Sequence, residues 1–161
     1  MKTLLLMRHA KSSWDDSSLD DHERPLNARG RRDAPVMGER LAESRFAPDR
    51  VLCSTAKRAR ETAELVIEAL AHTRPLDVRE GIYHATPREL IAAITEAGAG
   101  ERLLVIGHNP GLSELVELLA NDNRQMPTAA IAIIELPMEE WSEIGNARGR
   151  LVELMKPKDE D

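Results

Sequence analysis

The sequence predicts an α/β fold, in the form of a three-layer α/β/α domain around a mostly parallel sheet. Short apolar runs alternate along the chain with longer segments whose apolar residues recur at helical spacing. Several of the short runs end abruptly in polar residues, as buried strands do when they deliver functional groups at their carboxyl ends. Because only four residues are aromatic, we expect an aliphatic core.

The first half of the chain supplies strands, helices and one long polar loop. A strand over 2–8 is followed by a loop over 11–26, and loops of this length in compact domains are usually functional or mobile. Asn27 has the position of an N-cap, and Pro35 is expected to kink the helix that follows or to shift its start. The remaining elements of this half are a helix over 28–44, a strand over 51–53 and a helix over 57–71.

The second half carries the clearest helix signals. Thr86 and Glu89 have the spacing of a capping box, and Gly98 follows the expected end of the same helix. Asn109 has the position of an N-cap for the next helix. The expected elements are a strand over 76–79, a helix over 87–97, a strand over 103–106, a helix over 110–120, and two strands over 130–136 and 150–155 that pair antiparallel.

Length, charge and cysteine content narrow the class of protein. We expect one domain over 1–155, followed by a flexible tail over 156–161. The net charge of -6 argues against nucleic-acid binding, although a local cationic pocket can still bind a small anion. The single cysteine, Cys53, excludes an intrachain disulfide and indicates a reducing compartment. No stretch is long enough to span a membrane, so we expect a cytoplasmic protein.

Three polar clusters follow expected strands, and they contain Arg8-His9, Arg58 and His108-Asn109. Ligands of such sheets bind outside the carboxyl ends of the strands, so we expect these clusters to converge. A phosphoryl group carries roughly two negative charges near neutral pH. Arginine supplies bidentate and permanently charged donors to it, and helix N-termini at Arg58 and Asn109 add backbone N–H groups.

His9 is the candidate nucleophile at this site. Attack of imidazole on phosphorus gives a phosphohistidine, which water then hydrolyses. The ring must be neutral to attack, and we expect the neighbouring cations Arg8, Arg58 and Lys11 to lower its pKa. This two-step phosphoryl transfer requires neither a metal ion nor a cofactor.

Three segments of the chain resemble motifs of the histidine phosphatase superfamily, the phosphoglycerate mutase-like proteins. Residues 4–11 resemble the opening Arg-His-Gly motif, 54–62 are similar to the Ser-x-x-x-Arg-Ala-x-x-Thr motif, and 105–108 are similar to the second histidine motif. The small size and the Arg-Pro-Leu segment at 24–26 are most similar to SixA-like phosphohistidine phosphatases. The resemblance covers 2–155, and its motifs occur in the expected order.

The resemblance implies a phosphoglycerate mutase-like fold and assigns roles to four residues. Arg8, Arg58 and His108 would line the phosphate pocket, and His9 would receive the phosphoryl group. Such an enzyme would act on a phosphorylated protein, and the alternative substrate is a small phosphate ester. Neither nucleic acid nor a membrane is expected as a partner.

Other positions carry two interpretations each. Lys11 either contacts phosphate or is solvated, and it stands where many relatives have Glu, which weakens any claim to mutase substrates. Asn109 is a helix cap, a phosphate ligand or both. Glu80 is the nearest match to the carboxylate that donates a proton in most branch members, with a structural salt bridge as the alternative. Ala10 replaces the family's Gly, which should only tighten the turn.

Several further residues receive no functional role. Four residues separate Cys53 from Arg58, one fewer than in protein tyrosine phosphatases, so Cys53 is expected to be a buried small side chain. Arg60 is expected to pair with Glu64 along a helix surface. Trp14 either shields the site, lines a docking surface or packs within its loop. No metal-ligand spacing is found at His22, His72 or His84.

The leading hypothesis is a metal-independent phosphatase of phosphohistidine in a signalling protein. Its small size favours this role, because a protein substrate needs an open site and no lid domain is evident. The first alternative is a broad phosphomonoesterase acting on small molecules. The second is a phosphate-binding module without catalysis, against which the complete set of Arg8, His9, Arg58 and His108 argues.

Overall fold

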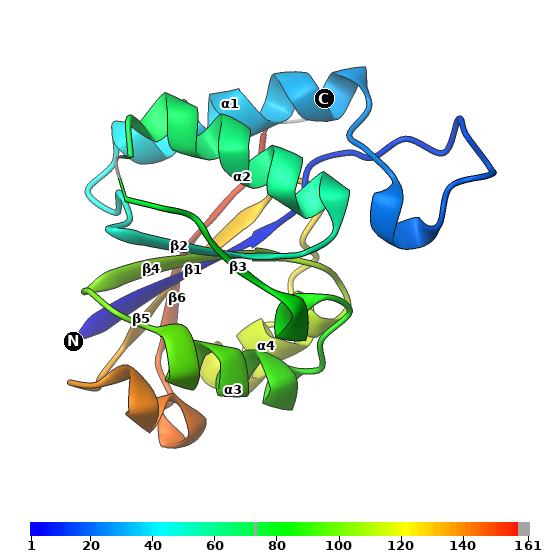
Figure 1. Ribbon diagram of the computed structural model, residues 1–161. Coiled ribbons are helices and arrows are strands. Elements are labelled where there is room, and N and C mark those ends of the chain that lie inside the picture. The colour runs from blue at the N-terminus through cyan, green and yellow to red at the C-terminus, as the bar shows by residue number, and fades with distance from the viewer. Residues whose placement is uncertain (73, 158–161) are drawn as a thin grey trace.

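The computed structural model describes residues 1–72 and 74–157, and it has three layers (Figure 1). One pair of helices covers each face of a central six-stranded sheet. The helices are α1 (Ala28–Ala42) and α2 (Lys57–Leu70) on one face, and α3 (Pro87–Ala97) and α4 (Gly111–Ala120) on the other. The predicted α/β/α architecture is therefore confirmed.

The sheet has the strand order β3-β2-β4-β1-β5-β6. Its strands are β1 (Lys2–Arg8), β2 (Arg50–Ser54), β3 (Asp77–Arg79), β4 (Arg102–Gly107), β5 (Ile131–Leu136) and β6 (Arg150–Met155). The four strands from β3 to β1 are parallel neighbours, whereas β5 is antiparallel to both β1 and β6. The prediction of a mostly parallel sheet with antiparallel pairing near the C-terminus is confirmed.

Burial on both faces explains why β1 is a continuous apolar run. Leu4 and Leu6 pack into the cluster beneath α3 and α4, whereas Leu5 and Met7 pack into the cluster beneath α1 and α2. Successive strand residues point to opposite faces, so a strand covered by helices on both sides must be apolar at every position. The largest fully buried side chains are all Leu, Ile or Met, which confirms the aliphatic core.

The helix caps predicted at Asn27 and Thr86 are present. The Asn27 side chain accepts a hydrogen bond from the Gly30 backbone N–H at 2.9 Å, and Thr86 and Glu89 form both halves of the capping box. Because Asn27 determines where α1 begins, Pro35 does not shift the start of the helix, and the alternative expectation of a kink stays a prediction. Pro35 lies within the continuous helix.

The strand order places the site between β1 and β4. The connection that leaves β1 leads to β2 on one side of the sheet, and the connection that leaves β4 leads to β5 on the other side. The carboxyl ends of such strands border a crevice. Arg8 is paired with Gly107 in the parallel register, so His9 and His108 follow side by side at that edge.

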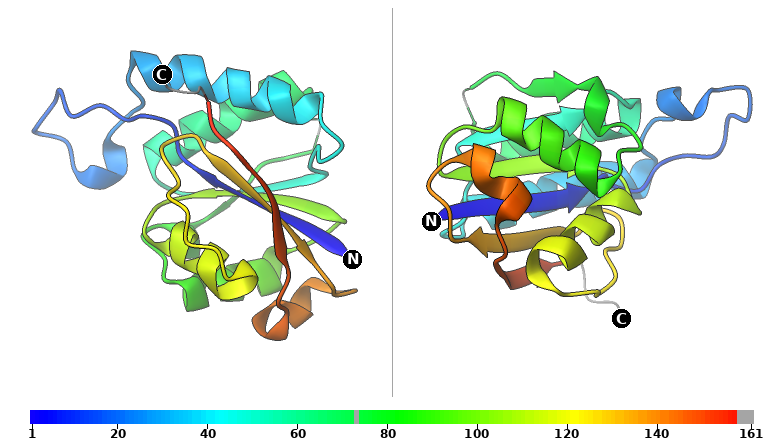
Figure 2. Two further views of the ribbon diagram at one scale, coloured as in Figure 1. Left: turned by 180° about the vertical axis from the view of Figure 1, so that it is seen from behind. Right: turned by 90° about the horizontal axis from the view of Figure 1, so that it is seen from below.

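The loop over 11–26 extends from this edge of the sheet and away from the three layers (Figures 1 and 2). Its base is closed by an antiparallel bridge between Ser12 and Leu26. It contains a short 3-10 helix, η1 (Asp21–Glu23), that the sequence did not predict. Two more such helices, η2 (Glu80–Ile82) and η3 (Trp141–Asn146), were also missed.

The chain end was predicted to be a flexible tail over 156–161, of which 158–161 lie outside the described residues. The carbonyl oxygen of Lys156 accepts a hydrogen bond from the Arg40 guanidinium. The single domain over 1–155 stays a prediction. In the part of the chain that the structure describes, no helix combines the length and apolar character needed to cross a bilayer.

We predict that Gly30→Ala destabilises the protein. A Cβ at Gly30 would lie 2.2 Å from the Lys11 carbonyl oxygen, a backbone atom two residues beyond His9. Overpacking of this kind costs about 1–3 kcal/mol, and the better helix propensity of alanine returns up to about 1 kcal/mol. Urea denaturation should therefore show a lower free energy of unfolding.

Gly81→Ala is the matched control, because a Cβ at that position meets no atom within 4 Å. Its free energy of unfolding should stay within about 0.5 kcal/mol of the parent protein. Equal stability of the Gly30 variant and the control would contradict the close approach of α1 to the backbone that follows His9.

Candidate active site

The His9 ring is buried at the carboxyl end of β1, and its tautomer follows from its contacts. Its Nδ1 lies 2.7 Å from the Ala10 carbonyl oxygen, which can only accept, so Nδ1 carries the proton. Nε2 therefore has a free lone pair in the neutral ring, and the Arg58 Nε–H donates toward it at 3.4 Å. A nucleophilic nitrogen thus faces a guanidinium cation.

The pKa of His9 is lowered to about 4, first by burial and then by the charges of Arg58, Arg8 and Arg24, against the opposing effect of the Ala10 carbonyl. We expected neighbouring cations to lower the pKa, and Arg58 and Arg8 do so, but removal from water is the larger cause. Lys11 is exposed and is not among the cations that act on the ring. His9 is therefore neutral at physiological pH.

His108 lies beside His9, with ring centroids 5.2 Å apart. Its Nε2 is 2.8 Å from Ser54 Oγ, and that oxygen already accepts a hydrogen bond from the Ala56 N–H at 3.1 Å. When the Ser54 hydroxyl donates to Nε2, the proton of the neutral ring is on Nδ1. Nδ1 is buried without a partner among the described residues, so its N–H is free to bind an anion.

The pKa of His108 is lowered to about 2, first by burial and then by the charges of His9, Arg58 and His84. A cationic His108 ring would therefore be unfavourable beside His9. The two rings form a neutral pair that offers one lone pair and one N–H group to a ligand.

Arg58 connects the nucleophile to the polar loop. Its guanidinium is 3% exposed; Nη1 donates to the Asp21 carbonyl oxygen at 2.6 Å and Nη2 donates to Asp21 Oδ2 at 3.0 Å. The Arg58 carbonyl accepts from Thr62 Oγ1, which in turn accepts from the Ala10 N–H at 3.0 Å. Thr62 thus ties the first turn of α2 to the residue after His9.

Arg8 approaches from the side of β5. Its Nη1 donates to the Met126 carbonyl oxygen at 3.0 Å, and its buried Nε has no partner among the described residues. The Asn109 side-chain amide donates to the same carbonyl at 3.2 Å. Arg8 therefore presents an unused donor in the region of the two histidines.

The predicted site residues divide into two groups. Arg8, His9, Arg58 and His108 are brought together, whereas Lys11 and Glu80 are exposed and make no side-chain hydrogen bond or ion pair with the residues that the structure describes. Glu80 therefore forms no salt bridge with the described residues, and its role as proton donor stays a prediction. Asn109 Oδ1 accepts from the Ser113 N–H at 3.1 Å, but Pro110 is the N-cap of α4, so the predicted N-cap at Asn109 was wrong by one residue.

Asp21 is the residue that the sequence analysis missed most clearly. Its Oδ2 accepts from the Tyr83 hydroxyl at 2.7 Å and from Arg58, and it lies 3.2 Å from His84 Nε2. Its Oδ1 accepts from Arg24 Nε at 3.2 Å. The only signal was its place in an acidic loop just before the Arg-Pro-Leu segment, where its acidic neighbours look alike.

Asp21 stays anionic in this arrangement. Partial burial alone would raise its pKa, but the hydrogen bonds from Tyr83 and Arg58 and the Arg58 charge hold the pKa well below its usual range. Arg24 contributes in the same direction. The carboxylate is therefore a permanent counter-ion to Arg58 rather than a source of protons.

The remaining expectations give mixed results. Cys53 is buried, and burial raises its pKa to about 12, as expected for a structural thiol. Arg60 does not pair with Glu64, because its Nε donates to the Thr55 carbonyl oxygen that precedes α2. Trp14 is exposed, with the Arg24 guanidinium 3.5 Å from its ring centre.

Two histidines that received no role lie close to the site. His22 Nε2 is 2.8 Å from Thr55 Oγ1, and the His84 ring centre is 5.5 Å from that of His108. Among residues 1–72 and 74–157, no three His, Cys, Asp or Glu side chains are grouped so that they could hold a metal ion.

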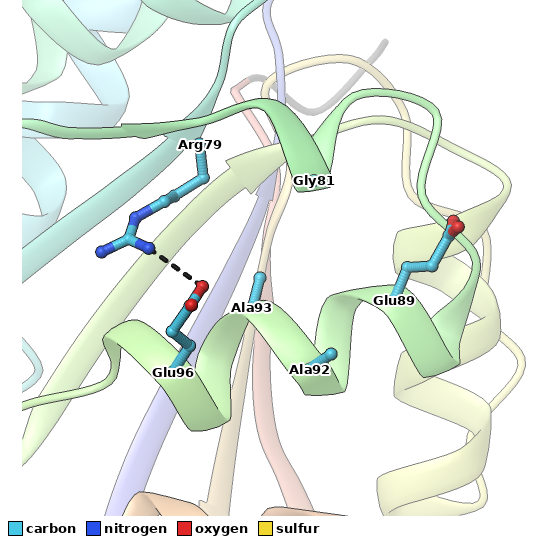
Figure 3. Close-up of a pocket in the computed structure, with 6 residues that line it drawn as sticks. All are labelled: Arg79, Gly81, Glu89, Ala92, Ala93 and Glu96. Atoms are coloured by element: carbon cyan, nitrogen blue, oxygen red, sulfur yellow. Dashed lines mark hydrogen bonds and ion pairs between the residues drawn. The ribbon is translucent and has the colours of Figure 1, made fainter.

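One hollow of the structure is lined by a residue of the clustered site, whereas another is not. A cavity of about 290 Å³ is lined by His84, His108 and Asn109 together with the start of α4. A second hollow, of about 380 Å³, lies between the segment around Gly81 and α3 (Figure 3). Its polar wall is the ion pair of Arg79 with Glu96, and none of the four clustered site residues lines it.

Comparison with known proteins identifies the family. The model of the histidine phosphatase superfamily, branch 1, matches residues 4–83. An uncharacterized protein of Mycobacterium tuberculosis is 36% identical and covers 94% of this chain and 100% of its own length. The matched region contains Arg8, His9 and Arg58.

Solved structures agree with this match. The protein histidine phosphatase SixA in complex with tungstate has a TM-score of 0.80 at 27% identity, over 96% of this chain and 97% of that one. A protein provisionally named phosphohistidine phosphatase SixA, from Nakamurella multipartitia, has a TM-score of 0.83 at 27% identity, over 97% and 96% of the two chains. The chain belongs to branch 1 of the histidine phosphatase superfamily, and it is a phosphatase.

Proposed function

We propose that this phosphatase hydrolyses phosphohistidine in proteins through a covalent phosphoenzyme at His9. The observation that carries the proposal is the free Nε2 lone pair of a neutral His9, which faces Arg58 and lies beside His108. A phosphate-binding module would need the cations, but it would have no need of a deprotonated nitrogen among them.

In the first step, His9 Nε2 attacks phosphorus in line with the leaving group. Negative charge spreads over three equatorial oxygens of the phosphoryl group. Three donors are available for these oxygens: Arg58 Nε, the unpartnered Arg8 Nε and the unpartnered His108 Nδ1. They are held in place before the substrate binds, which is the arrangement that stabilises developing charge most effectively.

In the second step, water attacks the phosphoryl group on His9 and releases phosphate. The ring can leave as a neutral imidazole because Nδ1 keeps its proton on the Ala10 carbonyl throughout. Neither step uses a metal ion, and the guanidinium groups supply the positive charge that metal ions provide in other phosphoryl transfers.

A phosphohistidine substrate is supported by two findings. The solved structures most like this chain at more than 25% identity include the SixA proteins, whose names state a histidine phosphatase activity. In addition, the rim of the site is open, since His84 is exposed and the loop over 11–26 extends outward beside it (Figure 1). An open rim admits a phosphorylated side chain that is attached to a protein. We extend the proposal to a role in signalling within the cytoplasm.

We predict that a phosphohistidine-containing protein phosphorylates this enzyme and that His9→Ala abolishes the transfer. Loss of the nucleophile should lower turnover by at least about 10³-fold. The measurement is a single-turnover reaction with radiolabelled phosphohistidine protein, in which the trapped label should be stable to alkali and labile to acid. His72→Ala is the matched control, because it removes a histidine after α2.

Three results would count against the proposal in separate ways. Undiminished labelling of the His9→Ala variant would show that His9 is not the nucleophile. A clear preference in kcat/KM for small phosphate esters would favour the phosphomonoesterase alternative over a protein substrate. Loss of activity in the presence of a chelator would contradict the metal-independent mechanism.

We also predict that His9 titrates near pH 4 in the folded protein. The pKa in the unfolded chain is about 6.5, so the unfolded chain binds more protons between these values. The ring therefore stays neutral down to pH 4 to 5 in the folded protein. The free energy of unfolding falls as the pH is lowered from about 6.5 to about 4. NMR of the ring Cε1 proton, assigned with His9→Gln, measures the midpoint, and a midpoint at or above 6.5 would contradict the neutral nucleophile.

A further inference from the structure

The backbone of His84 has an unusual conformation. Among the described residues, four that are not glycine have positive φ: Ala71, His84, Asn121 and Ala129. Ala71 and Asn121 are the C-caps of α2 and α4, where this conformation is common. Ala129 uses it while its N–H donates to the carbonyl of His9. His84, with φ of 50°, follows Tyr83, the C-cap of the short 3-10 helix η2, and lies next to the candidate site.

The conformation places the His84 ring among catalytic groups. The ring stacks on Tyr83 with centres 4.1 Å apart, and its centre is 5.5 Å from that of His108. His84 also lines the cavity of about 290 Å³ that His108 shares. Residues held in sparsely populated backbone conformations cluster at functional sites, which suggests a chemical role for the His84 ring.

Asp21 holds one edge of the ring. Its Oδ2 lies 3.2 Å from His84 Nε2, and this carboxylate stays anionic because Tyr83 and Arg58 donate to it. A carboxylate on one imidazole nitrogen orients the ring. The pairing leaves Nδ1 as the nitrogen available to a ligand in the cavity.

We propose that His84, oriented by Asp21, is the proton donor to the leaving group. This inference rests on the proposed phosphoenzyme route. The charged and titratable groups around the ring are Asp21 and, behind it, Arg58, then His108, and Glu114, which lines the same cavity. Of these, Asp21 is held anionic and His108 neutral, so neither supplies the proton.

The proton balance is complete over the two steps. As His9 Nε2 forms its bond to phosphorus, the bond from phosphorus to the leaving atom breaks, and the electron pair goes to that atom. The His84 imidazolium gives its Nδ1 proton to the leaving atom and becomes neutral, with the Nε2 proton kept on Asp21. Neutral His84 then takes a proton from the attacking water, which restores the imidazolium as phosphate is released.

The donor has a consequence for the range of substrates. Imidazole leaves phosphorus more easily than an alkoxide does, so a phosphohistidine needs less help from an acid than an alkyl phosphate needs. A donor at His84 therefore extends the activity toward phosphate esters of poor leaving groups. The effect of removing it must depend on the leaving group, whereas damage to the fold or to phosphate binding would affect all substrates alike.

The test is a leaving-group series measured on the His84→Asn variant. Asparagine tolerates positive φ as histidine does, but it has no transferable proton. We expect kcat/KM to fall by about 10²–10³-fold for an alkyl phosphate and progressively less for phenyl and 4-nitrophenyl phosphate. His72→Asn is the matched control, and it should show no dependence on the leaving group.

Chemical rescue supplies a readout that a structural role would not change. In His84→Gly, which also accepts positive φ, added imidazole should restore hydrolysis of the alkyl phosphate, with no gain in the parent protein. Equal losses for all leaving groups, no loss at all, or no rescue would overturn the donor role. Failure of the proposed function is distinguishable, because the parent protein would then form no phosphoenzyme with any substrate.

Discussion

The site depends on the parallel register between β1 and β4. Pairing of Arg8 with Gly107 brings the next residue of each strand, His9 and His108, to the same point at the edge of the sheet. A shift by one residue would turn every side chain of β1 to the opposite face and would move His9 away from its place beside His108. Leu4 and Leu6 pack into one buried cluster and Leu5 and Met7 into the other, so packing stabilises the same register that the chemistry requires.

The second constraint is electrostatic. Several guanidinium groups gather around two imidazoles, and burial makes both rings neutral. The charge of the buried Arg58 needs a counter-ion when no substrate is bound, and Asp21 provides one with its carboxylate and its carbonyl oxygen. The loop that carries Asp21 is thus part of the site. A single carboxylate orients Arg58 toward His9 and holds His84 at the rim.

Much of the fold could be predicted because local signals agreed with tertiary burial. Strands buried on both faces read as continuous apolar runs, and the caps at Asn27 and Thr86 gave two helix starts correctly. The 3-10 helices were missed because such short segments have no periodicity. Pro35 did not shift the start of α1, because the cap at Asn27, rather than the proline, determines where the helix begins.

The site was predictable where residues follow strands and was not predictable elsewhere. Arg8, His9 and His108 are placed together by strand register, and Arg58 by the turn into α2. Asp21 and His84 come from a loop and from a turn after a 3-10 helix, and only tertiary contact distinguishes them from their polar neighbours. Glu80 illustrates the limit of this reasoning, because proximity to a strand end does not determine whether a side chain is buried in the site.

The most direct test of the central claim is a crystal structure with vanadate or tungstate bound. The account predicts that His9 Nε2 contacts the metal atom of the oxyanion. The oxygens of the oxyanion should then contact Arg58 Nε, Arg8 Nε and His108 Nδ1. An oxyanion bound elsewhere, for example at the hollow beside Arg79, with His9 untouched, would contradict the account (Figure 3).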